Sequence, residues 1–353
     1  MKRLGNIFDK ICGMDNLHAA HLNAQKGKKH YQEVAKINEN PDVYLSDLHH
    51  MLSSGGFRNS EYEMFEKTEP KHRVIYKLPY YPDRIVQHAI MNVCEETWRK
   101  SLIRDTYSSL KGRGVHDGVR RMKVFMQDVP GTKYCLKMDV KKFYPSVNNA
   151  ILFDSVISKT IKCKGTLDLL KKIVFSIDGL PIGNYLSQMW GNLYLSEYDW
   201  KLKQNFSIKY YARYCDDIVI FGDNKDHLRY VFDWTKEYLW EHRKLNIKEN
   251  WQIFPVKSRG VDFLGYVFSH DKVTVRRNIV NTFKSKVLHI AKHWQSLGAT
   301  KILNVLMSYY GWFCCADAWK LWTKYASNNI KRIVRNVCVR DKITIPKPIR
   351  STT

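Results

Sequence analysis

Two runs of strand-forming residues that meet at a pair of aspartates constrain the fold of this chain more than any other feature. The runs cover 208–214 and 218–222, and Asp216 and Asp217 lie at their junction. Strand-like runs joined by so short a segment predict a β-hairpin with both aspartates at its tip. Loop tips held by rigid strands often carry chemistry, although an Asp-Asp turn is also a common way to close a hairpin.

A third carboxylate lies upstream, at the end of another predicted strand. Residues 133–140 alternate in character, which places Asp139 near the exit of a strand. Two carboxylates about 4 Å apart repel by about 4 kcal/mol at an effective dielectric near 20, so converging aspartates require a cation. Mg²⁺ prefers such oxygen ligands. We therefore expect Asp139, Asp216 and Asp217 to hold two Mg²⁺ ions, which Mn²⁺ could replace, and to serve phosphoryl transfer.

The composition favours a nucleic-acid partner and excludes a membrane span. The 353 residues carry 58 Lys and Arg against 34 Asp and Glu, a formal net charge of +24. Such a charge destabilises a compact fold unless a polyanion neutralises it, so nucleic acid is favoured over a solvated lysine surface. No uncharged apolar run approaches about 18 residues, as a transmembrane helix would require. The 8 cysteines show no CxxC pairs or zinc spacing, which indicates free thiols in a reducing cytoplasm.

Periodicity along the chain predicts an α+β fold with two or three subdomains. Helices are expected at 16–28, 44–52, 85–98, 151–172, 186–202 and 228–245, with three more between 283 and 325. Hairpins are expected from 62–66 with 73–76, and from 261–268 with 273–275. The tail from 340 to 353 is expected to be extended.

Six blocks of the sequence resemble, in the same order, those of prokaryotic reverse transcriptases. Residues 137–147, KMDVKKFYPSV, resemble the first catalytic block, and residues 214–217, YCDD, resemble the YxDD box. The other blocks are 83–87, 112–118, 180–188 and 263–266. The resemblance extends from about Arg73 to Phe268. It implies an α+β right-hand polymerase fold, with fingers, an antiparallel-sheet palm and a helical thumb, and RNA-templated DNA synthesis.

The resemblance also implies a division into subdomains. Residues 1–30 would be an N-terminal extension, 31–132 the fingers with a contribution from 148–182, and 133–275 the palm. The palm would include a primer grip formed by Phe263, Leu264, Gly265 and Tyr266. Residues 276–353 would form a helical thumb and a short tail, which leaves no room for an RNase H, maturase or endonuclease domain.

Individual site residues follow from the same resemblance. Asp139 and Asp216 would be the principal metal ligands, with Asp217 less direct and Val140 contributing its backbone carbonyl. Tyr144 would lie beneath the sugar of the incoming nucleotide and exclude a ribose 2′-OH, although a core tyrosine is the alternative. Two cations upstream, Lys71 and Arg73, would contact the triphosphate. An ordinary surface position is the alternative for Arg73.

The block at 180–188 resembles one subgroup of these enzymes. Many reverse transcriptases carry QGxxxSP there, whereas this chain has IGxxxSQ, with Ile182, Gly183 and Gln188 at the motif positions. That form resembles the enzymes of diversity-generating retroelements, which copy a template RNA and misincorporate opposite adenine. Replacing an amide by Ile182 removes a hydrogen-bonding group near the nascent pair and should lower fidelity, unless Ile182 only fills a loop pocket. Residues 248–252, KENWQ, depart from the Lys-Lys-Thr pattern of other groups, which weakens a general-acid role for Lys248.

The implied partners are a template-repeat RNA and its RNA/DNA hybrid, dNTPs, and a small, basic, oligomeric accessory variability protein. Two other functions stay open at this point. The chain could be a retron-like or other bacterial reverse transcriptase, or a catalytically idle RNA-binding scaffold that keeps the hand.

Overall fold

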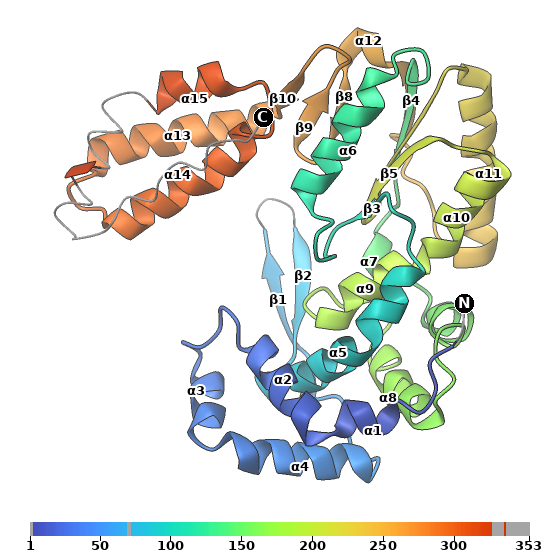
Figure 1. Ribbon diagram of the computed structural model, residues 1–353, viewed down its shortest axis with the longest axis vertical. Helices are drawn as coiled ribbons and strands as arrows, with labels where there is room; N and C mark the ends of the chain where they lie inside the picture. Colours follow the sequence, from blue (N-terminus) through green and yellow to red (C-terminus); the bar gives the residue numbers. More distant parts are fainter. Residues whose placement is uncertain (1–2, 69–71, 327–334, 337–353) are drawn as a thin grey trace. The chain divides into compact units, whose positions relative to one another are not determined.

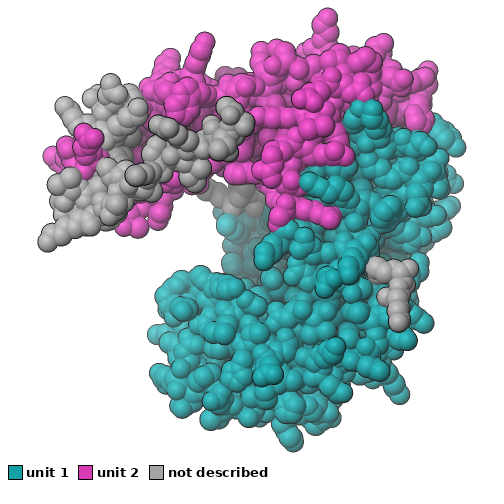
Figure 2. Space-filling model, viewed as in Figure 1, with its two compact units in different colours: residues 1–111, 137–218, 229–251 teal, residues 112–136, 219–228, 252–353 magenta. Residues whose placement is uncertain are grey.

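The chain forms two compact units, which are described separately (Figure 2). The computed structural model describes residues 3–68, 72–326 and 335–336. Unit 1 comprises residues 1–111, 137–218 and 229–251, and unit 2 comprises residues 112–136, 219–228 and 252–353. The range expected to form the palm, 133–275, therefore contributes to both units. Within the described residues, no helix is both long and apolar enough to cross a membrane.

Unit 1 begins with four helices that pack on one another, the first two of which also pack against α5 (Ile85–Lys100). They are α1 (Phe8–Cys12), α2 (Met14–Ala24), α3 (Gln32–Glu39) and α4 (Pro41–Ser53). Leu17 and Ala20 of α2 are fully buried, and the Asn16 side chain donates to the Ala89 carbonyl of α5 at 3.1 Å. The first 30 residues thus supply part of the core of this unit. The helix expected at 16–28 begins and ends earlier in the chain.

An antiparallel hairpin follows, as predicted (Figure 1). Its strands are β1 (Glu63–Lys67) and β2 (Arg73–Lys77), paired from Glu63 with Lys77 to Lys67 with Arg73. The pairing is reinforced by an exposed ion pair between Lys77 and Glu63 at 2.8 Å. A π-helical turn, η1 (Tyr80–Arg84), then leads into α5.

Two helices expected to be continuous are each interrupted. The range 151–172 holds η2 (Ile151–Ile157) and the start of α8 (Lys164–Val174). Between them, Ile161 forms a parallel bridge with Leu4 near the N-terminus, and this long-range pairing replaces helical hydrogen bonds. The range 186–202 likewise holds α9 (Tyr185–Tyr194) and α10 (Ser196–Asn205). At that junction the Ser196 hydroxyl donates to the Leu193 carbonyl at 2.7 Å, a local bond that competes with the helix.

The catalytic candidates lie on a five-stranded sheet of order β3-β5-β6-β4-β7. The strands are β3 (Thr106–Tyr107), β4 (Tyr134–Asp139), β5 (Tyr210–Tyr214), β6 (Asp217–Gly222) and β7 (Gln252–Pro255). The β3 and β5 pair is parallel, with Thr106 opposite Arg213, which departs from the antiparallel sheet expected for the palm. The short β3 is held against β5 by a hydrogen bond from the Arg213 backbone N–H to the Asp105 carbonyl at 3.0 Å. The predicted helix at 228–245 is α11 (Lys225–Arg243).

Unit 2 contains a three-stranded antiparallel sheet of order β10-β9-β8. Its strands are β8 (Val261–Phe263), β9 (Tyr266–Phe268) and β10 (Val273–Val275), and the unit also contains α6 (Val115–Gln127) and α12 (Val256–Arg259). The range 261–268 was expected to be one strand, and the structure divides it at Leu264 and Gly265. Both residues have positive φ, 55° and 84°, the backbone signature of a tight type I′ turn.

Three helices follow in the described part of unit 2, where the sequence predicted three helical segments. They are α13 (Arg277–His293), α14 (Ala299–Phe313) and α15 (Trp319–Tyr325). Phe283 is fully buried between them and stacks on Trp322, with ring centroids 5.5 Å apart. The tail expected to be extended, 340–353, lies outside the described residues.

Candidate active site

The predicted aspartate turn joins β5 to β6 within unit 1. Cys215 and Asp216 form the turn, and Asp217 is the first residue of β6. Cys215 adopts the left-handed conformation, with φ of 54°, so the chain reverses over two residues. The turn therefore presents Asp216 at the end of the sheet.

Asp139 ends β4 beside this turn. The N–H of the next residue, Val140, donates to the Asp216 carbonyl at 3.2 Å, which brings the two acidic segments together. The Asp216 carboxyl also lies close enough to Asp139 for the two side chains to interact electrostatically. Burial, followed by the nearby negative charge of Asp139, raises the pKa of Asp216 to about 6. A shift in this direction is typical of carboxylates that share one site.

Two lysines neutralise part of this negative charge. The Lys248 Nζ lies 2.6 Å from the Asp139 Oδ1, and both side chains are partly buried. The Lys248 backbone N–H also donates to the Asp139 carbonyl at 2.8 Å, so the lysine is anchored beside the aspartate. The Lys137 Nζ lies 3.9 Å from the Asp217 Oδ1. Asp217 thus lies near Lys137, whereas Asp139, the neighbour of Asp216, pairs with Lys248.

The donor atoms at this end of the sheet fit a divalent cation of the magnesium type. Within residues 3–68, 72–326 and 335–336, no three Asp, Glu, His or Cys side chains converge closely enough to hold a metal ion by themselves. Mg²⁺ is usually bound by one or two carboxylates together with substrate phosphates, which matches the convergence of Asp139 and Asp216. The Lys248 ammonium on Asp139 shows that the site already attracts positive charge.

The backbone pairing around Val140 determines which side of the strand its carbonyl faces. The Lys141 backbone N–H donates to the Asn246 carbonyl at 2.7 Å, and the Lys248 backbone N–H donates to the Asp139 carbonyl. Val140 is therefore a non-hydrogen-bonded partner of Ile247, and its own N–H and C=O face the opposite side, toward the Asp216 turn.

Tyr144 lies against the same turn. It follows Lys142, which has a φ of 45°, and belongs to the short α7 (Phe143–Ser146). Its hydroxyl is 3.7 Å from the Cys215 Sγ, and burial raises its pKa, so the phenol stays neutral. A Cβ added to Gly191 would lie 3.6 Å from the Tyr144 ring. The ring is therefore closely backed by α9.

The 180–188 block is hydrogen-bonded to β2 and packs closely against it. The Tyr76 N–H donates to the Ile182 carbonyl at 2.8 Å, and a Cβ added to Gly183 would lie 2.2 Å from the Tyr76 carbonyl oxygen. Ile182 is half-buried, whereas Gln188 is exposed on α9.

Of the two expected triphosphate ligands, Arg73 is exposed at the start of β2. Lys71 lies outside the described residues.

Comparison with known proteins identifies the family. The sequence profile of the family described as reverse transcriptase (RNA-dependent DNA polymerase) matches residues 65–268, more than half of the chain. The chain belongs to the reverse transcriptase family. The carboxylate pair and its turn lie within the matched residues, and the α+β right-hand polymerase fold is thereby confirmed.

Two curated relatives of this reverse transcriptase come from Escherichia coli. It is 26% identical over 143 residues to protein YkfC of strain K12, a match covering 36% of this chain and 37% of YkfC. It is 25% identical over 233 residues to the retron Ec73 reverse transcriptase, a match covering 60% of this chain and 70% of that protein. Among solved structures, apo telomerase from Candida tropicalis aligns with a TM-score of 0.51 at 12% identity. That alignment covers 87% of this chain and 63% of the telomerase chain, and it concerns the fold alone.

The predicted primer grip of the reverse transcriptase forms the turn between β8 and β9 in unit 2. Phe263 and Tyr266 face each other across the turn, and the Tyr266 hydroxyl donates to the Trp312 carbonyl of α14 at 3.1 Å. A Cβ added to Gly265 would lie 2.5 Å from the Trp312 ring. The turn is thus supported by the helices that follow it.

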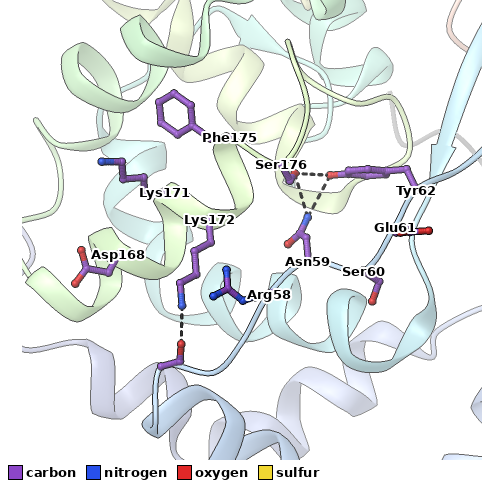
Figure 3. Close-up of a pocket in the computed structure, with 11 residues that line it drawn as sticks. Arg58, Asn59, Ser60, Glu61, Tyr62, Asp168, Lys171, Lys172, Phe175 and Ser176 are labelled. Carbon is purple, nitrogen blue, oxygen red and sulfur yellow. Dashed lines mark hydrogen bonds between the residues drawn. The ribbon is translucent and has the colours of Figure 1, made fainter.

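A cavity of about 970 Å³ in unit 1 was not anticipated from the sequence (Figure 3). Its walls come from residues 55–62 and from α8 with the two residues that follow it. The Asn59 amide donates to the Ser176 hydroxyl at 3.1 Å and to the Tyr62 hydroxyl at 3.2 Å. Tyr62 also accepts a hydrogen bond from Asn184, which lies within the 180–188 block, at 2.9 Å. The cavity wall is thereby linked to the predicted nucleotide-binding block.

Proposed function

We propose that this chain is an RNA-directed DNA polymerase that extends a primer on an RNA template by nucleotidyl transfer. The observation that carries the proposal is the meeting of Asp139 and Asp216 at the end of the sheet, within a chain of the reverse transcriptase family. The net charge of +24 supports binding to RNA and to an RNA/DNA hybrid.

Each residue around the carboxylates would have a separate role in the reaction. Asp139 and Asp216, with the Val140 carbonyl, would hold divalent metal ions. A bound metal would lower the pKa of the primer 3′ hydroxyl and neutralise charge on the transferred phosphate. Tyr144 would set the space left for the sugar of the incoming nucleotide. The Lys248 ammonium would pair with the Asp139 carboxylate when no metal is bound.

More specifically, we propose that the enzyme serves a diversity-generating retroelement in the cytoplasm. It would copy a template-repeat RNA with low fidelity opposite adenine, assisted by a small basic accessory protein. The supporting feature is the IGxxxSQ sequence of the 180–188 block, with Ile182 in place of an amide. A retron-like function is the second candidate, because the chain is related to the retron Ec73 reverse transcriptase over 233 residues.

Primer extension on a defined RNA template tests the general proposal. Wild type should produce cDNA in the presence of Mg²⁺ and dNTPs, and Asp216→Asn should lose nearly all product because a metal ligand is removed. Equal products from the two proteins would refute polymerase activity at this site and would leave an RNA-binding scaffold as the function.

Sequencing of the same cDNA tests the specific proposal. Errors should concentrate opposite template adenine in wild type, and Ile182→Gln should reduce them about fivefold, the effect of one net hydrogen bond of about 1 kcal/mol. Errors spread evenly over the four template bases would favour the retron-like function instead.

A further inference from the structure

A fully buried ion pair lies directly behind the catalytic turn. Arg213, in β5, has no exposed side-chain surface, and neither has Asp199 of α10. The guanidinium donates to the Asp199 carboxylate through Nε at 2.9 Å and through Nη2 at 2.5 Å. Well-packed apolar residues often stabilise a core as well as a buried ion pair does. The role of the pair is therefore to be found in what else the guanidinium contacts.

Further hydrogen bonds of the Arg213 guanidinium reach the turn and helix α9. Its Nη1 donates to the Cys215 carbonyl at 3.0 Å, and Nη2 donates to the Asn192 carbonyl of α9 at 3.1 Å. Cys215 has a φ of 54°, which a residue other than glycine adopts only where its surroundings impose it. The guanidinium thus holds the peptide group that leads directly into Asp216.

A second set of contacts prevents this arrangement from shifting. The Asn192 amide donates to the Ser108 carbonyl at 3.0 Å, and the Cys215 thiol donates to the Ser108 hydroxyl at 3.0 Å. On the far side, Asp199 accepts hydrogen bonds from the Tyr211 hydroxyl and from the Thr106 hydroxyl. The ion pair is therefore braced by three different segments of unit 1.

We propose that Arg213 and Asp199 are positioning residues that set the metal affinity of the site formed by Asp139 and Asp216. Their ion pair fixes the Cys215 carbonyl, and with it the direction in which Asp216 meets Asp139. This inference rests on the proposed function, since it takes those two carboxylates to be the metal ligands. Both positioning side chains are fully buried and out of reach of a substrate, so their loss should weaken metal binding and leave the KM for dNTP near that of wild type.

The test separates positioning from simple stabilisation. Arg213→Met combined with Asp199→Asn removes both buried charges together, avoiding an unpaired ion, and keeps an oxygen for Tyr211 to donate to. Mn²⁺ binding to the nucleotide-free protein is measured by electron paramagnetic resonance, and thermal unfolding is measured in EDTA. We expect the double variant to unfold within a few degrees of wild type while its Mn²⁺ affinity falls at least about tenfold. In primer extension, the half-saturating Mg²⁺ concentration should rise by a similar factor.

A matched control uses another buried arginine of the same unit. Arg243 donates to the Tyr194 carbonyl at 2.7 Å and pairs with Glu197 at 2.9 Å. Among the described residues, none of its side-chain hydrogen bonds reaches the turn. Arg243→Lys should lower the unfolding temperature and leave Mn²⁺ affinity unchanged. A double variant of normal stability that binds Mn²⁺ like wild type would overturn the inference, as would an equal loss of affinity in Arg243→Lys. If Asp216→Asn binds Mn²⁺ as tightly as wild type does, the proposed function itself fails.

Discussion

Replacing Asp216 by asparagine should stabilise the metal-free protein at neutral pH, although it removes a proposed metal ligand. Burial and the adjacent Asp139 raise the pKa of Asp216 from an ordinary 3.8 to about 6. At about 1.36 kcal/mol for each pH unit, the ionised carboxylate costs the folded state up to about 3 kcal/mol. Asparagine imitates the neutral acid and avoids this cost, so the active site carries a strain that its metal would relieve.

The stability gain of Asp216→Asn over wild type should increase with pH. Because the folded-state pKa lies above the unfolded value, protonation of Asp216 stabilises the fold fully below about 3.8, and this contribution is lost as pH rises through about 6. The advantage of Asp216→Asn over wild type should therefore be absent near pH 4 and reach up to about 3 kcal/mol at pH 8. Saturating Mg²⁺ at pH 8 should narrow the difference, since it binds and stabilises only the protein with both carboxylates.

Urea unfolding in EDTA, followed at several values between pH 4 and 8, measures this difference. Asp154→Asn, which changes an exposed carboxylate of η2, is the control and should alter stability little at any of these pH values. The reasoning would be refuted if Asp216→Asn showed no gain at pH 8, or if the same gain persisted at pH 4.

Three further predictions address individual residues. Tyr144→Ala should reduce discrimination of dNTP against rNTP by at least about tenfold, and unaltered discrimination in single-nucleotide incorporation would remove Tyr144 as the sugar gate. Lys248→Met should lower the half-saturating Mg²⁺ concentration by up to about fivefold, because a partly exposed ion pair worth up to about 1 kcal/mol no longer competes with the metal; a rise would contradict this. Gly183→Ala should destabilise the protein by about 2–4 kcal/mol, since its Cβ would lie 2.2 Å from the Tyr76 carbonyl oxygen at a φ of +134°, whereas Gly114→Ala, with nothing within 4 Å, should change urea unfolding little.

The features that could be predicted from the sequence are those set by local periodicity. The hairpin with Asp216 in its turn and the strand ending at Asp139 follow from alternation and from the turn between the strands. Both features are determined within about ten residues of chain, so tertiary contacts reinforce them and do not alter them. The helical segments after residue 276 were predictable for the same reason.

The interruptions of predicted elements arise from contacts that periodicity does not report. The break after η2 depends on pairing of Ile161 with Leu4, more than 150 positions away in the sequence. The division of β8 from β9 depends on positive φ at Leu264, a residue type that gives no turn signal. Each case requires knowledge of which distant segment lies nearby, and a single sequence does not contain it.

The ion pair between Arg213 and Asp199 could have been predicted in part from the sequence. Residues 210–214 read Tyr-Tyr-Ala-Arg-Tyr, and a strand that is apolar on both sides of an arginine is a poor place for a solvated charge. Burial of that arginine requires a carboxylate partner and acceptors for its remaining N–H groups. Asp199 and the Cys215 carbonyl meet both requirements. The identity of the partner could not be deduced from spacing, but the need for one could, and a charged residue just before a catalytic turn is therefore a reason to look for a positioning contact.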